Sequence, residues 1–180
     1  NEEGGIKAVL EAVKRELIAG DELIVVDGAS RDATAQVAAR LAEKVLVTEP
    51  GRAGQMQAGA LAASGEVLLF LHADTFLPEG WRGQLAGVWD GPNRPAVTAF
   101  RLGFDAPGVH YRLMERLTVL RTRLTGVAQG DQAIAVSARD FRAALGELER
   151  VRQALLQDPT RKEDLAAVER RIKEAEDLRV

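Results

Sequence analysis

Two aspartates, Asp27 and Asp74, each stand just after a short run of apolar residues, 23–26 and 67–71. Runs of this length suit strands that are buried on both faces, as in the middle of a parallel sheet. In open α/β sheets the carboxyl ends of the strands form the edge where ligands bind. Two carboxylates that meet there could hold a hard divalent cation or hydrogen-bond a ribose or base. Two independent helix N-caps are the alternative, and the spacing alone does not separate the two interpretations.

Three further positions carry groups that could join this chemistry. The segment 51–55, Gly-Arg-Ala-Gly-Gln, begins a helix whose free N–H groups and Arg52 could meet a phosphate, although small residues equally suit a closely packed helix. His72 could be a metal ligand or a partner of Asp74, and a simple hydrogen-bonding role is the alternative. Asp131 follows a glycine and precedes a predicted strand, so it could point into a cleft or occupy a turn.

Apolar periodicity predicts alternating strands and helices along most of the chain. The expected elements are helix 6–17, strand 23–26, helix 33–43, strand 45–47, a helix from 51, strand 66–71, a helix from 78, strand 97–104, helix 108–125 and strand 132–136. The βαβ series at the start predicts a parallel sheet with helices on its faces. The expected fold class is therefore α/β, a three-layer, Rossmann-like domain with a mostly parallel sheet.

The expected helix 108–125 has an apolar stripe and four arginines. The stripe consists of Val109, Leu113, Leu117, Leu120 and Leu124. We expect this stripe to face the core and the arginines to form a solvated face. Contact of the helix with an anionic substrate or with a membrane surface is the alternative.

The chain changes character at about residue 138, where two long helical patterns follow one another around Asp158-Pro159-Thr160. We expect an α/β domain over 1–137 and a helical hairpin over 138–180, packed on the domain or extending from it. Glu163 and Asp164 fall in the first turn of the second helix, where the dipole favours acidic residues, so capping is their stronger interpretation. Two amphipathic helices also allow self-association with a second copy.

Composition narrows the class of protein. The chain has 180 residues, 46% apolar and 28% charged, which is ordinary for one globular domain. A net charge of −3 gives no sign of nucleic-acid binding, and the absence of cysteine excludes disulfides and thiolate metal sites. No apolar stretch approaches the ~20 residues of a membrane span. We expect a soluble, cytoplasmic protein.

Four motifs in a fixed order resemble those of family 2 glycosyltransferases, which have the GT-A fold. They are V-V-D-G-A-S-R-D-A-T at 25–34, G-R-A-G-Q-M-Q-A-G at 51–59, L-F-L-H-A-D-T at 69–75 and G-D-Q-A-I at 130–134. The resemblance covers about residues 1 to 146. It is closest to the bacterial arsenosugar-biosynthesis-type subgroup, which carries H-A-D where relatives have D-x-D.

This resemblance implies a nucleotide-diphosphate-sugar donor such as a UDP-sugar, an unknown acceptor hydroxyl, a Mn²⁺ or Mg²⁺ ion and an inverting transfer. Carried over by position, the donor-site residues are Asp27 at the base or ribose, then Gly28, Ser30, Asp32, Arg52, Gln55 and Asp74. Asp74 would be the main metal ligand, with His72 in place of the first acid of D-x-D. Asp131 and Asp164 are the candidate catalytic carboxylates, because a general base must take the proton of the acceptor hydroxyl.

The family pattern also holds features that this sequence lacks. A strand ending in P-x-x-N-E precedes the position of Asn1-Glu2, and we expect it to lie outside this sequence. After the G-D-Q strand the family has a G-G-F turn and an E-D pair, whereas Ala144-Leu145-Gly146 here leads into the helical hairpin. A truncated or engineered non-catalytic α/β module, keeping a nucleotide-sugar pocket or only the scaffold, is the alternative function. A phosphatase of the haloacid dehalogenase type is set aside, because Ala29 stands where its second aspartate is needed.

Overall fold

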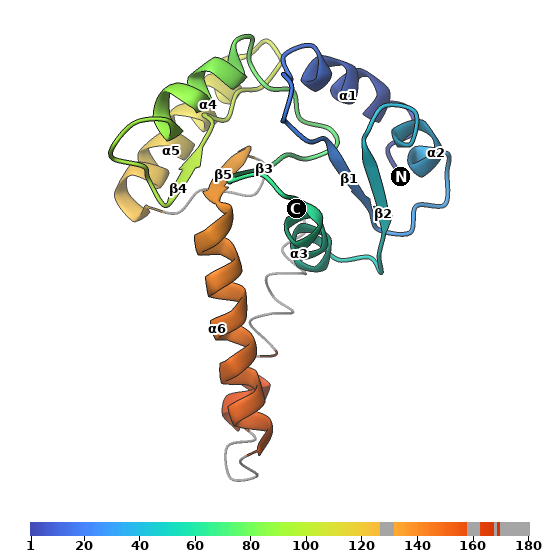
Figure 1. Ribbon diagram of the computed structural model, residues 1–180. Helices are drawn as coiled ribbons and strands as arrows, with labels where there is room; N and C mark the ends of the chain where they lie inside the picture. Colours follow the sequence, from blue (N-terminus) through green and yellow to red (C-terminus); the bar gives the residue numbers. More distant parts are fainter. Residues whose placement is uncertain (127–131, 158–162, 168, 170–180) are drawn as a thin grey trace.

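The computed structural model describes residues 1–126, 132–157, 163–167 and 169 (Figure 1). Helices and strands alternate along the chain in an α/β arrangement. The elements are α1 (Ile6–Lys14), β1 (Ile24–Asp27), α2 (Thr34–Ala38), β2 (Lys44–Val47), α3 (Arg52–Ala62), β3 (Val67–Phe70), α4 (Trp81–Trp89), β4 (Val97–Ala99), α5 (Val109–Thr125), β5 (Ile134–Ser137) and α6 (Ala138–Gln157). Residues 163–167 are also helical.

The α/β class and the order of the expected elements are confirmed, with shifts at their ends. The two largest shifts concern α2, which was expected to reach residue 43 and ends at Ala38, and β4, which was expected to reach residue 104 and ends at Ala99. Beyond Ala38 the chain tightens, because the Leu41 N–H donates to the Ala38 carbonyl three residues back at 2.9 Å. Such three-residue spacing is typical of the last turn of a helix, so the helical periodicity continues after the regular helix has ended.

The strands form two sheets. In the first, β1 and β2 pair in parallel, from Ile24 opposite Lys44 to Asp27 opposite Val47, as the βαβ pattern predicts. In the second, the order is β3-β5-β4 and both pairings are antiparallel. The expectation that the strand at 67–71 lies in the middle of a parallel sheet, buried on both faces, is therefore wrong. Its partner is β5, and within β3 only Leu68 is buried.

The main-chain carbonyls of β1 point alternately toward β2 and toward the opposite edge of the strand. The carbonyls of Leu23 and Asp27 accept hydrogen bonds from Glu43 and Thr48, on the side of β2. Because successive residues of a strand point their carbonyls to opposite sides, the Val26 carbonyl faces the other edge. No described strand pairs with β1 or β3 at these outer edges.

Helix α3 joins the two sheets by packing on both. A Cβ at Gly59 would lie 3.2 Å from Val26 Cγ2, so the absence of a side chain there lets α3 approach β1 closely. The next residue, Ala60, is buried with Leu68 of β3 and Val136 of β5. A second core forms under α1 and α2 around Ile6, Leu10 and Ala38, which pack with residues of β1 and β2.

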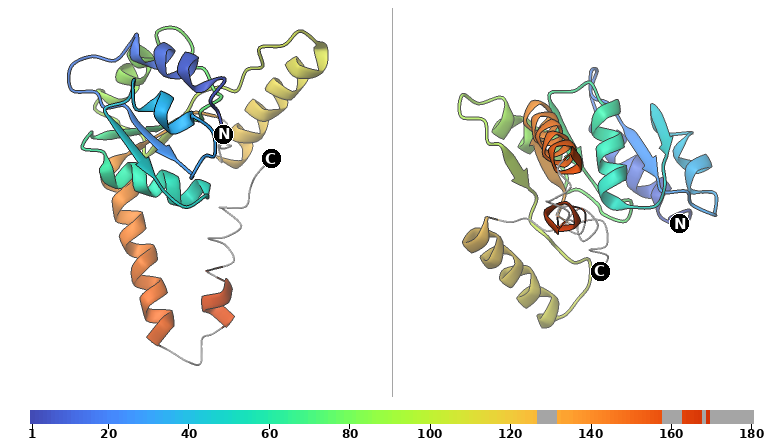
Figure 2. Two further views of the ribbon diagram at one scale, coloured as in Figure 1. Left: turned by 90° about the vertical axis from the view of Figure 1, so that its right-hand side faces the viewer. Right: turned by 90° about the horizontal axis from the view of Figure 1, so that it is seen from below.

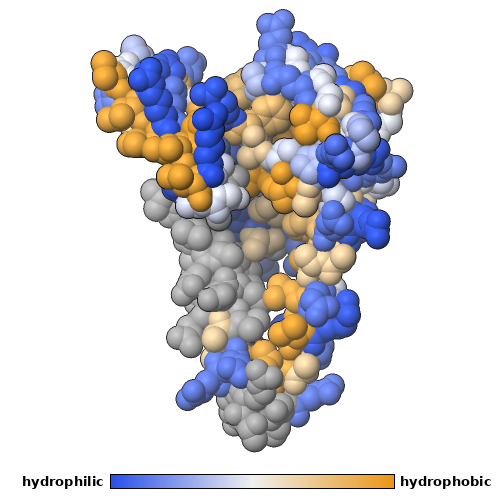
Figure 3. Space-filling view, turned by 90° about the vertical axis from the view of Figure 1, so that its left-hand side faces the viewer, coloured by the Kyte–Doolittle hydropathy of each residue, from blue (hydrophilic) through white to orange (hydrophobic). Residues whose placement is uncertain are grey.

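Helix α5 lies at the periphery and turns its apolar stripe outward. Val109, Leu113, Leu117, Leu120 and Leu124 are all exposed, and α5 contains no buried residue. The expectation that this stripe faces the core is wrong. Figure 2 shows α5 set apart from the other helices, and Figure 3 shows a hydrophobic band along it at the upper left. Among the described residues, no helix is long and apolar enough to cross a membrane.

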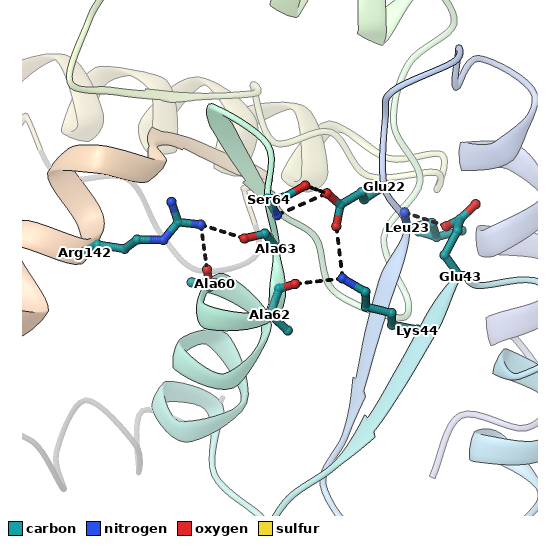
Figure 4. A network of polar contacts seen from close by, with 9 residues as sticks. All are labelled: Glu22, Leu23, Glu43, Lys44, Ala60, Ala62, Ala63, Ser64 and Arg142. Atoms are coloured by element: carbon teal, nitrogen blue, oxygen red, sulfur yellow. Dashed lines mark hydrogen bonds and ion pairs between the residues drawn. The ribbon is translucent and has the colours of Figure 1, made fainter.

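Helix α6 begins directly after β5 and extends away from the sheets (Figures 1 and 2). Its base is fixed to α3, because Arg142 Nη2 donates to the carbonyls of Ala60 at 3.2 Å and Ala63 at 2.7 Å (Figure 4). The rings of Phe141 and Phe70 pack with centroids 5.2 Å apart. The division into a domain over 1–137 and a hairpin over 138–180 remains a prediction.

The same end of α3 is also connected to the first sheet (Figure 4). Lys44 Nζ donates to the Ala62 carbonyl at 2.9 Å and pairs with Glu22 at 3.5 Å. The Ser64 N–H donates to Glu22 Oε1 at 3.1 Å, and its hydroxyl contacts the same oxygen. Together with Arg142, these contacts fix the C-terminal end of α3, so its N-terminal end is held in place over the strand ends.

Candidate functional site

The first part of the candidate site is the turn that follows β1. Asp27, the last residue of the strand, is 5% exposed, and its Oδ2 accepts the Ser30 N–H at 2.8 Å. Ala29 has φ +58°, in the left-handed region, which lets the chain reverse within three residues. The buried carboxylate thus shapes the turn with one oxygen, and the backbone of Gly28 and Ser30 lies at the carboxyl end of the strand.

The second part is the first turn of α3, which contacts this turn through Gln55. Gln55 Nε2 donates to the Val26 carbonyl at 3.0 Å, on the edge of β1 that has no strand partner. A Cβ at Gly28 would lie 3.0 Å from the same Nε2 atom. Glycine at 28 thus leaves room for the Gln55 side chain, which a Cβ there would push aside by a few tenths of an ångström. The pattern predicted a place for Gln55 at the site but not this contact.

The third part is the segment after β3. Arg52, the first residue of α3, places its guanidinium on the ring of His72, with Nη2 2.7 Å from Nδ1 and in contact with Nε2 as well. Asp74, two residues further, is exposed and accepts a hydrogen bond from the Thr75 hydroxyl at 3.3 Å. The start of α3 thus spans the gap between the ends of β1 and β3, with Gln55 at one and Arg52 at the other.

This arrangement can bind an anion. The first turn of a helix carries N–H groups without intrahelical partners and the positive end of the helix dipole. In α3 these groups lie beside the guanidinium of Arg52, and the strand end at Asp27 adds a carboxylate that can accept hydrogen bonds from hydroxyl or amino groups. A ligand with both a phosphate and a hydroxyl-bearing part would match the two sides.

Asp32 holds the loop that follows β1, and its place in the donor site remains a prediction. Its Oδ1 accepts the Thr34 N–H at 3.1 Å and also contacts the Thr34 hydroxyl, and its Oδ2 accepts the Glu3 N–H at 3.3 Å. The hydrogen bond from the Thr34 hydroxyl lowers the pKa of Asp32 below its usual value. Asn1 Oδ1 accepts the Arg31 N–H at 2.7 Å, so the start of the chain lies against this loop. The Asp-x-Thr spacing at 32–34 is a sequence signal for such local hydrogen bonds.

The candidate metal ligands are Asp74 and His72. Among the described residues no group of three or more His, Cys, Asp or Glu side chains could hold a metal ion. The exposed carboxylate of Asp74 is a suitable hard ligand, whereas both ring nitrogens of His72 face the Arg52 guanidinium. Two cavities in the structure lie elsewhere, one beside α5 and one between β3, α4 and α6.

Of the two candidate catalytic carboxylates, the described part of the chain includes Asp164 and not Asp131. Asp131 lies outside the described residues. Asp164 is exposed in the helical segment 163–167, which Figures 1 and 2 show beside the distal half of α6, away from the start of α3. Its place in the reaction therefore remains a prediction.

Comparison with known proteins places the chain in a family. The sequence model described as glycosyl transferase family 2 matches residues 1–159. Uncharacterized glycosyltransferases of Mycobacterium bovis and Mycobacterium tuberculosis are each 40% identical over 157 residues, which is 83% of this chain and 69% of theirs. The crystal structure of mannosyl-3-phosphoglycerate synthase from Rubrobacter xylanophilus is similar with a TM-score of 0.48 and 22% identity. That match covers 75% of this chain, and the chain spans about half of that structure, 48%.

Proposed function

Because this chain belongs to glycosyl transferase family 2, we propose that it binds a nucleotide-diphosphate-sugar and transfers the sugar to an acceptor hydroxyl. The observation that supports this most is the placement of the first turn of α3. It sets Arg52 and the helix N-terminus between the ends of β1 and β3, and a diphosphate that bridged these ends would meet both.

In this proposal each group has a separate part in holding the donor. The buried carboxylate of Asp27 accepts hydrogen bonds from the ribose or base, with the backbone of Gly28 and Ser30 beside it. Arg52 and the free N–H groups of α3 bind the phosphates, since guanidinium groups pair well with phosphate oxygens. Gln55 keeps the helix against β1, so the two halves of the donor are held in a fixed relation.

We propose that Asp74 is the protein ligand of a Mn²⁺ or Mg²⁺ ion, with His72 as a second candidate. The exposed carboxylate of Asp74 at the end of the β3 segment supports this assignment. Such an ion would neutralise the charge that builds on the nucleotide diphosphate as it leaves. The H-A-D sequence at 72–74 supports placement in the arsenosugar-biosynthesis-type subgroup.

The transfer also needs a base for the acceptor hydroxyl. We propose the carboxylate of Asp131, in the G-D-Q motif, for this role, with Asp164 as the alternative. Direct attack of the acceptor on the anomeric carbon would invert its configuration. A cytoplasmic location and self-association remain predictions of the sequence.

Calorimetric titration with UDP, with and without Mn²⁺, tests the donor site. Arg52→Gln should weaken UDP binding about tenfold or more in both conditions, because a charged hydrogen bond to phosphate contributes about 1.5–3 kcal/mol. Asp74→Ala should remove the part of the affinity that depends on Mn²⁺. Asp90→Ala, an exposed aspartate at the end of α4, is the matched control and should bind as the wild type does.

The two parts of the proposal fail separately. Unchanged UDP affinity in Arg52→Gln would contradict the phosphate site, and unchanged Mn²⁺ dependence in Asp74→Ala would contradict the metal ligand. Measuring the release of UDP from UDP-sugars distinguishes the two candidate bases. Asp131→Asn should still bind UDP but lose the transfer activity, whereas Asp164→Ala should keep the transfer activity. If neither UDP nor another nucleoside diphosphate binds, the non-catalytic module becomes the better description.

A further inference from the structure

Helix α5 is turned so that its polar side faces the protein. Six positions along it are half-buried, namely Tyr111, Glu115, Thr118, Val119, Arg121 and Thr122. Glu115 Oε1 accepts the Phe104 N–H at 2.9 Å, and the rings of Tyr111 and Phe104 lie 5.3 Å apart. Among the described residues, Thr122 Oγ1 is buried with no hydrogen-bond partner. This inner face therefore buries little apolar surface.

The outer face carries the apolar side chains instead. Val109 is 86% exposed and Leu124 78%, and between them Leu113, Leu117 and Leu120 are 55%, 53% and 52% exposed. Their spacing places all five on one side of the helix, and Figure 3 shows the resulting hydrophobic band. A continuous apolar face of this kind on a folded domain indicates a surface that another protein or a membrane covers.

The charges beside this apolar face indicate which kind of partner can cover it. Helix α5 contains four arginines and one glutamate, a net charge of +3, in a chain whose net charge is −3. Arg112, Arg116 and Arg123 are exposed next to the stripe. A second copy that paired stripe to stripe would bring two sets of these arginines together, and like charges at an interface are unfavourable. An anionic surface is complementary to them.

A hollow on this helix has the same mixed character. It measures about 440 Å³ and is lined by Gly108, Val109, Leu113 and the side chains of Arg112 and Arg116. Its mostly apolar lining suits an acyl chain, and the arginines among its residues could meet a phosphate, although Arg112 Nη1 also pairs with Glu115 at 2.6 Å. Leucines on one side and arginines beside them are the pattern of helices that lie in the plane of a membrane interface.

We propose that α5 is a peripheral membrane-binding helix that docks on anionic phospholipid through its leucine stripe and its flanking arginines. The stripe would enter the boundary between headgroups and acyl chains while the arginines contact lipid phosphates. This proposal is independent of the transferase activity, because it concerns a surface made by α5 and the loop that ends at Gly108.

Sedimentation with vesicles tests the proposal, using phosphatidylcholine alone and phosphatidylcholine mixed with phosphatidylglycerol. The wild type should bind the mixed vesicles and bind phosphatidylcholine much less. Leu117→Ser with Leu120→Ser should reduce the binding about tenfold or more, since two apolar side chains no longer enter the interface. Arg116→Gln with Arg123→Gln should reduce it about fivefold for each charge removed, and added salt should do the same.

Matched double variants elsewhere on the surface give the controls. Leu61→Ser with Val88→Ser removes two exposed apolar side chains from α3 and α4, and Arg15→Gln with Arg40→Gln removes two exposed arginines. Both control proteins should bind vesicles as the wild type does. Circular dichroism of every variant shows whether the fold is kept.

Three outcomes would overturn the proposal. The first is a wild type that binds neither kind of vesicle. The second is equal loss of binding in the stripe variants and the controls. The third is a dimer in size-exclusion chromatography with light scattering that Leu117→Ser with Leu120→Ser dissociates, without vesicle binding, which would make the stripe a contact between copies.

Discussion

The contact between Gln55 and the Val26 carbonyl allows a sharp test of how α3 is held on β1. Replacing Gln55 by glutamate keeps the size of the side chain but exchanges the donor NH₂ for a carboxylate oxygen. At neutral pH this oxygen would face the carbonyl oxygen that Gln55 Nε2 now approaches at 3.0 Å. Two acceptors would then meet at the edge of β1, where no described strand offers a replacement donor.

The size of the effect follows from three contributions. Losing the hydrogen bond costs about 1 kcal/mol, and leaving the half-buried carbonyl against another acceptor costs about 1–2 kcal/mol more. The helix N-terminus favours an acidic side chain by about 0.3–1 kcal/mol and acts in the opposite direction. We therefore expect the free energy of unfolding of Gln55→Glu to fall by about 2 kcal/mol at neutral pH.

Gln57→Glu is the matched control for this change. Gln57 lies on the same helix, two residues further, and is exposed. The substitution adds the same charge near the same helix end without an opposing carbonyl. Its free energy of unfolding should stay within about 0.5 kcal/mol of the wild type.

The pH dependence of Gln55→Glu has a definite sign. When protonated, the new carboxyl group can donate to the Val26 carbonyl, so its pKa in the folded state would lie above the unfolded value of about 4.3. A group with a raised folded pKa contributes stability below its unfolded pKa and loses it as pH rises through the folded pKa. The deficit relative to the wild type should therefore shrink as pH falls from 7 to 4.

Urea denaturation of the three proteins at pH 7 and near pH 4 measures these differences. A Gln55→Glu protein as stable at pH 7 as the Gln57→Glu protein would refute the contact with Val26. A deficit that stays constant with pH would show that the loss has another origin than the facing acceptors.

Three further predictions concern contacts that position the site. Arg142→Ala should lower the free energy of unfolding by about 2 kcal/mol in urea, because it removes two charged hydrogen bonds to the last turn of α3; Arg139→Ala, exposed on the same helix, should change it by less than about 0.5 kcal/mol. Arg82 binds Asp21 with both Nε and Nη2, and this hydrogen bonding lowers the pKa of Asp21. A depressed carboxyl pKa contributes stability that is fully present above the unfolded pKa and is lost as pH falls through the lower folded pKa. The advantage of the wild type over Arg82→Gln should therefore be full at pH 6 and shrink progressively as pH falls below about 3.8, and an advantage that stays constant in acid would contradict this ion pair. Thr98→Val should destabilise the protein by about 1–3 kcal/mol, because the buried Trp89 Nε1–H would lose the acceptor that now lies at 3.2 Å. Tryptophan fluorescence during denaturation measures this loss of stability, and an unchanged midpoint would contradict the prediction.

The sequence alone determined which segments become strands and helices in the α/β domain and where the candidate site lies along the chain. Apolar runs at 23–26 and 67–71 each predicted a strand, and each strand is present within a residue or two. These predictions succeed because apolar periodicity and turn residues act locally, over a few neighbours. The order of the motifs also indicated the family, which the match over residues 1–159 confirms.

Tertiary structure decided what each of these elements contacts. Nothing within 67–71 states that β3 pairs antiparallel with β5, since the partner arrives more than sixty residues later. The stripe of α5 has the same spacing whether it faces a core or the outside, and its rotation depends on tertiary contacts such as those of Tyr111 and Glu115 with Phe104. Likewise, Gln55 meets Val26 because helix α3 packs across β1. Local patterns set the shape of each element, whereas its neighbours depend on which distant surfaces cover it.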